Sequence, residues 1–429
     1  MKLFERLFKH ITLAFLLCFF APSTASSPNN EPTLQADSIE ISLLTCGPRQ
    51  QVYSLYGHTA IRFQDKQSGR DIAINYGVFS FDKPFFVLRF VFGLTDYEMG
   101  IAPFDIFEWE YGPTGCGVRQ QVLNLTAQEK MAIAQAVDRN MEPQNRVYRY
   151  NFFYDNCTTR ARDIIANNLN GRIVYDTSTP QHLNTSTPQH HNTPAQYPTF
   201  RNLIHNYNET HRWARFGNDL LLGVKADYNT TFEQQQFLPE RLCADFERAH
   251  IISADGTKRN LVSSSFWLFE PTTKQQSIQQ TNMSILDVFS PLVTFSILSI
   301  LTLIIAIVEY RRKRIIWVFD TIIMLTTGTC GLLLFAMIFS QHPTVSLNLQ
   351  ILLLNPINIF MLYSVTKAAH KNRIHWWTKA WSALILLLLA GSFLQSYAEG
   401  ITIVALSLLL RNISNIYTFK NTGSKQPEA

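Results

Sequence analysis

The chain has 429 residues and a formal net charge of +5, and long apolar segments predominate after about residue 284. Because this length exceeds that of a usual single domain, we expect two structural units rather than one enlarged core. Much of the excess positive charge lies in short connections between the apolar segments. The sequence therefore gives no indication of nucleic-acid binding, and it contains neither a CxxC pair for zinc nor a glycine-rich phosphate loop.

The N-terminus has the pattern of a secretory signal peptide. Three basic residues lie within the first nine positions, followed by an apolar run over residues 11–21 and small residues that end near Ala25. The run is shorter than the roughly 20 residues that span a bilayer. We therefore predict a signal peptide over residues 1–25, which would deliver residues 26–283 to the far side of the membrane as an exported domain.

The exported domain begins with a strand pattern. Residues 38–64 predict two strands joined by a turn at Gly47, and residues 71–81 predict a third strand. We expect His58 and Asn75 to lie on neighbouring antiparallel strands. Further on, residues 125–141 have helical periodicity that starts with the capping-box pattern of Thr126 and Glu129.

A single cysteine stands at the predicted start of a helix in "YNFFYDNCTTRARDII", residues 150–165. Asp155 or Asn156 can cap this helix, and Cys157 falls in its first turn. A buried stripe follows at Ala161, Ile164, Ile165 and Leu169. The N–H groups and partial positive charge of a helix N-terminus favour thiolate over thiol.

A nucleophilic Cys157 needs a group that takes and returns protons near neutral pH, and His58 is the most economical candidate. Asn75 offers an amide oxygen that would hold the imidazole in one tautomer. The order of His58, Asn75 and Cys157 is that of a circularly permuted papain arrangement. Each residue also has a structural reading, with Cys157 as a buried apolar residue, His58 as a strand residue and Asn75 as a turn residue.

The remaining cysteines and histidines suggest less chemistry. Cys46, Cys116 and Cys243 also lie in the exported domain, and one disulfide among them is compatible with that compartment. An eight-residue unit occurs twice over residues 178–193 and carries three histidines. No cysteine or carboxylate completes a ligand set there, so we interpret it as a duplicated surface loop and expect neither a metal nor a cofactor.

Five apolar segments predict a transmembrane domain of five helices over residues 284–429, with a cytoplasmic C-terminal tail. They are residues 286–309, 315–340, 347–365, 381–394 and 401–417. The connections 310–314 and 366–379 are basic, which places them in the cytoplasm by the positive-inside rule. The start of the first span is then outside, where the signal peptide would deliver the exported domain.

Some residues near the membrane have two interpretations. Asn355, Asn358 and Arg411 lie within or near spans, where polar residues are functional candidates by default. Arg411 also has the simpler explanation that it snorkels toward the cytoplasm. The aromatic-rich residues 81–94 can line an apolar channel or dip into the membrane interface, although a plain hydrophobic core is the expected role of most of these side chains.

Five long motifs resemble the Lnb family of Bacteroidota. They are "LLTCGPRQQVYSLYGHTAIRF", "INYGVFSFD", "FVLRFVFGLTDYEMG", "NFFYDNCTTRARDII" and "FGNDLLLG". The resemblance covers nearly the whole mature chain. It implies an α+β architecture, in which a permuted papain-like periplasmic domain, distantly similar to NlpC-type hydrolases, precedes five membrane helices. The repeated loop and "GPTGCGVRQQ" depart from the family's expected pattern.

The resemblance further implies a lipoprotein N-acyltransferase of the bacterial inner membrane with its catalytic domain in the periplasm. Cys157 in "DNCTTR" then matches the nucleophile and His58 in "GHTAIR" the base, whereas Asn75 rests on the geometric argument alone. The expected partners are diacylated lipoproteins as acceptors and a membrane lipid as acyl donor. The alternatives are a membrane-anchored cysteine peptidase or amidase acting on cell-wall peptides, and a non-catalytic envelope scaffold.

Overall fold

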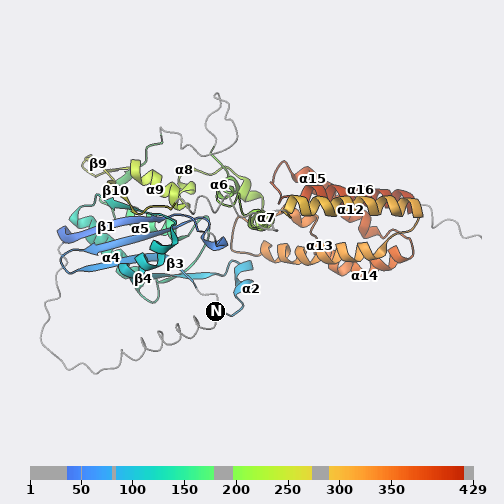
Figure 1. The fold of residues 1–429 in the computed structure, drawn as a ribbon, viewed down its shortest axis with the longest axis horizontal. Helices are drawn as coiled ribbons and strands as arrows, with labels where there is room; N and C mark the ends of the chain where they lie inside the picture. The colour runs from blue at the N-terminus through green and yellow to red at the C-terminus, as the bar shows by residue number, and fades with distance from the viewer. Residues whose placement is uncertain (1–35, 50, 80–83, 178–196, 273–288, 420–429) are drawn as a thin grey trace, which may run out of the picture. The chain divides into compact units, whose positions relative to one another are not determined.

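The computed structural model describes residues 36–49, 51–79, 84–177, 197–272 and 289–419. The predicted signal peptide, the repeated loop and residues 420–429 lie outside these residues. The described chain is of mixed α+β class. We call residues 36–272 the sheet domain and residues 289–419 the bundle (Figure 1).

The sheet domain is built on a seven-stranded antiparallel sheet with the strand order β10-β5-β1-β2-β3-β4-β6. Its strands are β1 Ile39–Cys46, β2 His58–Asp65, β3 Arg70–Val78, β4 Asp96–Pro103, β5 Val118–Leu123, β6 Val147–Arg149 and β10 Val262–Phe269. A smaller sheet is formed by β7 Arg172–Val174, β8 His250–Ile252 and β9 Lys258–Asn260. The predicted antiparallel pairing of the strands that carry His58 and Asn75 is confirmed.

Helices cover both faces of the large sheet. The helices of the sheet domain are α2 Phe86–Val91, α3 Phe104–Tyr111, α4 Ala127–Met141, α5 Cys157–Ala166, α6 Phe200–His205, α7 Arg212–Leu221, α8 Phe232–Gln235 and α9 Pro239–Arg248, with short 3-10 turns at η1 Ala36–Ser38, η2 Val52–Ser54, η3 Gly112–Thr114 and η4 Val224–Asp227. Helices α4, α5 and α9 pack on one face, where residues such as Ile61, Ile164 and Phe246 form the main core. Helix α3 packs on the other face, around Ala60 and Phe107.

The two predicted helix starts in the sheet domain are confirmed. Helix α4 begins with the full capping box of Thr126 and Glu129. Helix α5 begins at Cys157 and is capped by Asn156, not by Asp155, which instead forms a two-pronged ion pair with Arg160. In the buried stripe of α5, Ala161, Ile164 and Ile165 are buried, and Leu169 is partly buried against the same core.

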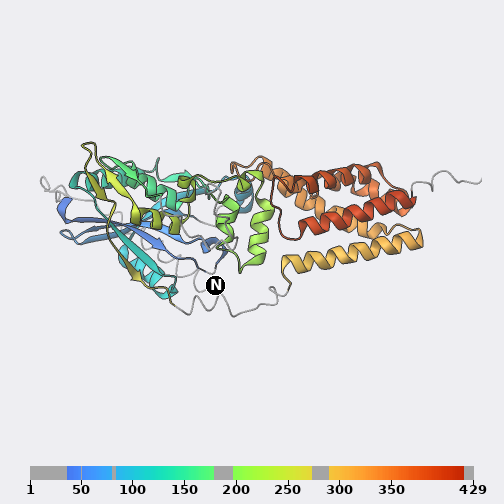
Figure 2. The ribbon, with the colours of Figure 1, turned by 90° about the horizontal axis from the view of Figure 1, so that it is seen from above.

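The bundle consists of α12 Pro291–Arg312, α13 Trp317–Ile338, α14 Ile357–His370, α15 Trp376–Gly391 and α16 Ile401–Phe419, with η5 Leu349–Leu352 before α14 (Figures 1 and 2). Among the described residues, four stretches are long and apolar enough to cross a membrane, and η5 and α14 together form one of them. The remaining apolar helix, α15, has 16 residues. The predicted count of five spans therefore corresponds to four helices of full length and one shorter helix.

The third predicted span is not one continuous helix. It is interrupted between η5 and α14, next to Pro356, which has no N–H to continue a helical ladder. The indole N–H of Trp381 donates to the carbonyl of Leu353 at 3.1 Å. A side chain of the neighbouring helix α15 thus satisfies one of the carbonyls near the interruption, as the interior of a membrane favours.

The two asparagines of this region have protein partners. The Asn358 side chain donates to the Thr327 hydroxyl and accepts from the indole of Trp377, both at 2.8 Å. The Asn355 side chain accepts from the N–H of Ile357 at the start of α14. Both asparagines therefore stabilise the interrupted helix.

Arg411 does not snorkel toward the cytoplasm, contrary to the simpler expectation. Its side chain is 2% exposed, and its guanidinium forms two hydrogen bonds to Glu309 and two to Asp320, which lie on α12 and α13. Asn415 also donates to Glu309 at 2.9 Å. The buried charge of Arg411 thus joins three helices, because each of its neighbours supplies the opposite charge or a hydrogen bond.

We predict that Arg411→Met destabilises the bundle by about 3–5 kcal/mol, because it leaves two carboxylates buried without a cation. The free energy of unfolding can be measured on the full-length protein in mixed micelles. Arg314→Met is the matched control, since Arg314 is exposed between α12 and α13, and it should stay within about 0.5 kcal/mol of wild type. Equal stability of the two variants would contradict the structural role of Arg411.

Candidate active site

His58 and Asn75 lie side by side on one face of the sheet. His58 is the first residue of β2 and Asn75 lies opposite Ala60 on β3, so the two side chains are diagonal neighbours. The Nε2 atom of His58 lies 3.0 Å from Oδ1 of Asn75. Because this amide oxygen can only accept, it selects the tautomer that carries the proton on Nε2 and leaves Nδ1 without one. The Tyr111 ring lies nearly parallel to the imidazole, with the ring centroids 6.4 Å apart.

Cys157 owes its position to the capping residue before it. The side-chain oxygen of Asn156 accepts hydrogen bonds from the N–H groups of Thr158 and Thr159, each at 2.9 Å. Its amide nitrogen donates to the carbonyls of Phe152 and Phe237 at 3.0 and 2.8 Å. Asn156 is 3% exposed, so the start of α5 is fixed from both sides.

The thiol and the imidazole meet at Gly77, at the end of β3. Helix α5 packs on one face of the sheet, whereas His58 is on the other, so the two groups must come together where the sheet ends. A Cβ at Gly77 would lie 3.8 Å from Cβ of Cys157 and 4.0 Å from Cε1 of His58. Gly77 also has a φ of +123°, which side chains rarely adopt. The positive φ therefore favours a glycine here, and Gly77 lies within van der Waals distance of both groups.

The electrostatics favour an ion pair between Cys157 and His58. Burial disfavours the thiolate, but the positive charge of His58 and hydrogen bonds from His58, the Thr59 N–H and Thr158 outweigh it, so that the pKa of Cys157 is lowered to about 7. Burial likewise opposes the imidazolium, but the thiolate and the hydrogen bonds to Cys157 and Asn75 raise the pKa of His58. A substantial fraction of the thiol is therefore ionised near neutral pH, with the imidazolium of His58 beside it.

A pocket of about 380 Å³ opens beside the thiol. Cys157, His58 and Asn75 form part of its wall, and aromatic side chains predominate in the remainder. The aromatic residues are Tyr53, Tyr56, Tyr76, Phe79, Tyr97, Tyr111, Tyr150, Phe152 and Phe237. The pocket thus combines aromatic walls with several polar groups, and the reactive thiol lies among them.

The aromatic wall is stacked and contains one charged pair. The rings of Phe79, Tyr97 and Tyr150 form a continuous stack, with centroid separations of 4.9 and 4.1 Å. Arg49 and Glu110 also line the pocket, 3.7 Å apart, and the Arg49 guanidinium lies 4.0 Å above the Tyr111 ring. The pocket wall therefore combines an aromatic stack with one ion pair.

The other candidate residues do not join this site as ligands or crosslinks. Cys46, Cys116, Cys243 and Cys330 are free thiols, as is Cys157, so none of these five forms a disulfide. Within the described residues, no group of three or more histidine, cysteine or acidic side chains could hold a metal ion. The repeated histidines of residues 178–193 lie outside the described residues.

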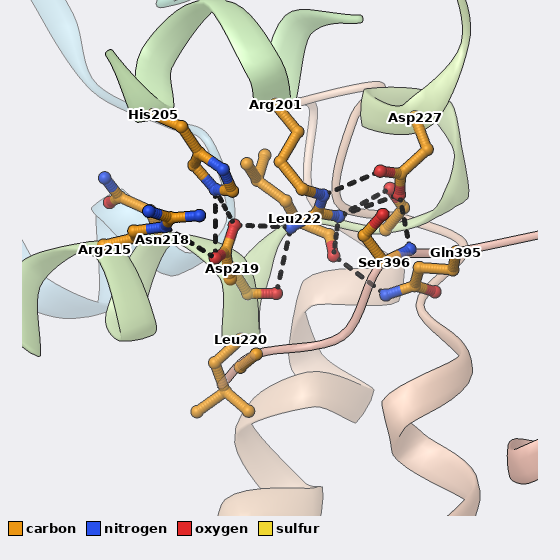
Figure 3. A network of polar contacts seen from close by, with 12 residues as sticks. Arg201, His205, Arg215, Asn218, Asp219, Leu220, Leu222, Asp227, Gln395 and Ser396 are labelled. Carbon is orange, nitrogen blue, oxygen red and sulfur yellow. Dashed lines mark hydrogen bonds and ion pairs between the residues drawn. The ribbon is translucent and has the colours of Figure 1, made fainter. Parts of the chain in front are cut away.

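A buried polar junction ties the sheet domain to the bundle and was not predicted from the sequence (Figure 3). Arg201, 2% exposed, binds Asp219 through Nη1 at 2.8 Å and Asp227 through Nε at 2.8 Å. From the bundle, Gln395 donates to the carbonyl of Leu222 and the N–H of Ser396 to Asp227. In Figures 1 and 2 the green helices α6 and α7 that carry this junction lie between the sheet and the bundle.

The junction reaches the pocket through Tyr56. The Tyr56 hydroxyl accepts a hydrogen bond at 2.7 Å from Asn218, the neighbour of Asp219 on α7, and the Tyr56 ring lines the pocket two positions before His58. The sequence signal for this connection is weak, because it consists of single polar residues spread from position 56 to position 396. Their partnership depends on the fold and not on spacing.

Comparison with known families gives matches to both parts of the chain. Residues 27–202 match the family model of the Lnb N-terminal periplasmic domain, and residues 280–422 match that of the Lnb transmembrane domain. A search of curated proteins and a search of solved structures each gave no significant match. The matches support a membrane protein with a periplasmic domain. The permuted papain-like fold stays a prediction.

We predict that iodoacetamide alkylates Cys157 with a rate that rises with pH through a midpoint near 7, because the reactive thiolate forms above that pH. In His58→Ala the midpoint should move up by more than about one pH unit, since burial remains while the positive charge is lost. Peptide mass spectrometry on the full-length protein measures the rate. His370→Ala, an exposed histidine in the bundle, should leave the midpoint in place, and an unshifted His58→Ala would rule out the ion pair.

Proposed function

The chain belongs to the Lnb family, and on this premise we propose that it is a lipoprotein N-acyltransferase of the inner membrane, in which Cys157 carries the acyl chain as a thioester. The observation that supports this proposal most is the arrangement of Cys157, His58 and Asn75 on the wall of an aromatic pocket. The donor in the proposal is an ester of a membrane lipid. The acceptor is the α-amino group of the diacylated cysteine at a lipoprotein N-terminus.

The first half-reaction forms the thioester. The Cys157 thiolate attacks the ester carbonyl, the ester C–O bond breaks, and the alcohol leaves with the proton that His58 donates. Negative charge develops on the carbonyl oxygen during the attack. Asn156 binds the N–H groups of Thr158 and Thr159 but not that of Cys157, so the Cys157 N–H at the helix start is placed to donate to this oxygen.

The second half-reaction transfers the chain to nitrogen. The neutral α-amine attacks the thioester, His58 takes the proton that the nitrogen loses, and the C–S bond breaks to restore the Cys157 thiolate. Asn75 holds the imidazole orientation through both steps by its bond to Nε2. The sum of both steps converts an ester and an amine into an amide and an alcohol, which is favourable without ATP because the amide is the more stable product.

The pocket walls favour a lipid over a peptide. The stacked rings of Phe79, Tyr97 and Tyr150 line the pocket beside the thiol, and burial of an acyl chain against apolar ring atoms contributes about 0.8 kcal/mol for each methylene. Attachment to membrane helices also raises the local concentration of two lipid substrates. Both features would be superfluous for a hydrolase of soluble cell-wall peptides.

A cysteine peptidase or amidase is the second candidate. The observation that favours it is the pair of Arg49 and Glu110 in the pocket wall, since these side chains can bind the charged ends of a peptide. Water would then accept the acyl group in place of an amine. A non-catalytic scaffold would need none of this arrangement and predicts that replacing Cys157 changes stability alone.

We predict that Cys157→Ser abolishes N-acylation of lipoproteins. The N-terminal lipopeptide of one abundant lipoprotein is analysed by mass spectrometry in cells with the wild-type gene, without it, or with Cys157→Ser. The amide-linked acyl chain should decrease by roughly 1000-fold in both altered strains, while the protein is still made.

Cys330→Ser is the matched control, because Cys330 is a free thiol on a membrane helix, and it should leave the lipopeptide acylated. An unchanged lipopeptide in the strain without the gene would refute the acyltransferase and turn attention to peptide hydrolysis. Loss of the amide-linked acyl chain in the strain without the gene, but not in Cys157→Ser, would show that Cys157 is not the nucleophile.

A further inference from the structure

Helix α2 is a short segment of the sheet domain with unusually exposed apolar side chains. Phe85, which precedes it, is 79% exposed, and Leu88 and Phe90 within it are 54% and 49% exposed. Val91 packs against the cluster that contains Met337 and Val345 of the bundle. The expectation that most apolar residues of 81–94 form a plain core is wrong for Phe85, Leu88 and Phe90.

The position of α2 is fixed against the outer end of α13. The N–H of Gln341, three residues after α13, donates to the carbonyl of Phe92 at 3.0 Å. Next to it, a Cβ at Gly93 would lie 3.0 Å from the Gln341 nitrogen, so the two backbones touch. Arg149 also donates to the Gln341 side chain at 2.6 Å.

A second set of contacts holds α2 to the sheet. Arg89 binds one oxygen of Asp96 at 2.7 Å, and Arg149 binds the other at 2.8 Å. Asp96 is the first residue of β4, and Arg149 the last of β6. Helix α2 is thus connected by charge to the sheet edge and by the backbone that follows it to the bundle, while Leu88 and Phe90 stay exposed.

The exposed side chains of α2 continue the apolar surface of α13. Phe335 and Phe339 at the outer end of α13 are 46% and 64% exposed, and their rings contact each other. In a transmembrane helix such residues face lipid. Because the backbone of α2 touches the chain directly after Phe339, Leu88 and Phe90 lie where the lipid-facing surface meets the interface.

The pocket wall lies close to α2 in the sequence. Val78, the last residue of β3, is 43% exposed and lines the pocket together with Phe79. The Phe79 ring contacts that of Tyr53, a pocket residue that is 68% exposed. An apolar rim therefore borders the pocket on the strand that leads toward α2.

We propose that α2 is inserted into the lipid surface of the outer leaflet and that acyl chains pass along it from the bilayer to the pocket. The lipid contact follows from the anchoring at Gln341 and the exposure of Leu88 and Phe90. The passage of substrate along α2 additionally rests on the proposed acyl transfer. The proposed occupant of this surface is lipid. If a second copy of the chain or a lipoprotein covered it instead, crosslinking would identify that protein as the partner.

The test places the photocrosslinker p-benzoylphenylalanine at Leu88 or Phe90 of the full-length protein in native membranes. Phe266 is the matched control, because it is 45% exposed but lies on β10, at the opposite edge of the sheet from β4 and β6. After irradiation, mass spectrometry measures lipid adducts on the labelled peptide. We expect about tenfold more lipid adduct at positions 88 and 90 than at position 266.

Equal adduct yields at the three positions, or adducts at 88 and 90 with protein in place of lipid, would overturn the proposal. The crosslink needs no turnover, so it can be repeated in Cys157→Ser. Lipid adducts at positions 88 and 90 in a protein that retains Cys157 but fails to acylate lipoproteins would support the membrane contact while refuting the proposed function. Acylation without lipid adducts would refute the contact alone.

A second measurement tests the path. Phe90→Glu should lower the yield of N-acylated lipopeptide by about tenfold, because a carboxylate resists insertion into lipid, and the pH midpoint of Cys157 alkylation should not change. Phe266→Glu should leave the acylation yield at the wild-type level. Equal acylation by the two variants would mean that acyl chains reach the pocket by another route.

Discussion

The site depends on the hydrogen bonds of one buried amide. The side-chain oxygen of Asn156 caps α5, and its side-chain nitrogen donates hydrogen bonds to the carbonyls of Phe152 and Phe237. Its four bonds satisfy the whole amide, so the cap cannot move without leaving buried polar groups unpaired. The direction of the Cys157 thiol follows from this cap, and so does the helix N-terminus that favours its thiolate.

The surroundings link this chemistry to the membrane at two places. The junction around Arg201 fixes α6 and α7 to the loops of the bundle, and Asn218 passes that anchoring to the pocket wall at Tyr56. On the other side, α2 is held to the end of α13 through Gln341. Two sets of contacts on different elements thus connect the pocket wall and its neighbouring strands to the helices of the bundle.

Local patterns in the sequence predicted the site better than its surroundings. The strand alternation around His58 and Asn75 and the capped start at Cys157 are short-range signals, and the structure brings all three residues together. The ion pair of Arg411 depends on a partner more than 90 positions away in the sequence. The Arg201 junction depends on a loop of the bundle. No local sequence pattern encodes either contact. The exposure of α2 was misjudged because apolar composition alone does not distinguish a core from a surface that faces lipid.

The most direct test of the account is to look for the thioester itself. Purified full-length protein is incubated with phospholipid and without a lipoprotein acceptor, and the peptide containing Cys157 is analysed by mass spectrometry before and after neutral hydroxylamine. The account predicts an added acyl mass on Cys157 that hydroxylamine removes. Acylation of lipoproteins by the same preparation with no acyl group on Cys157 would contradict it.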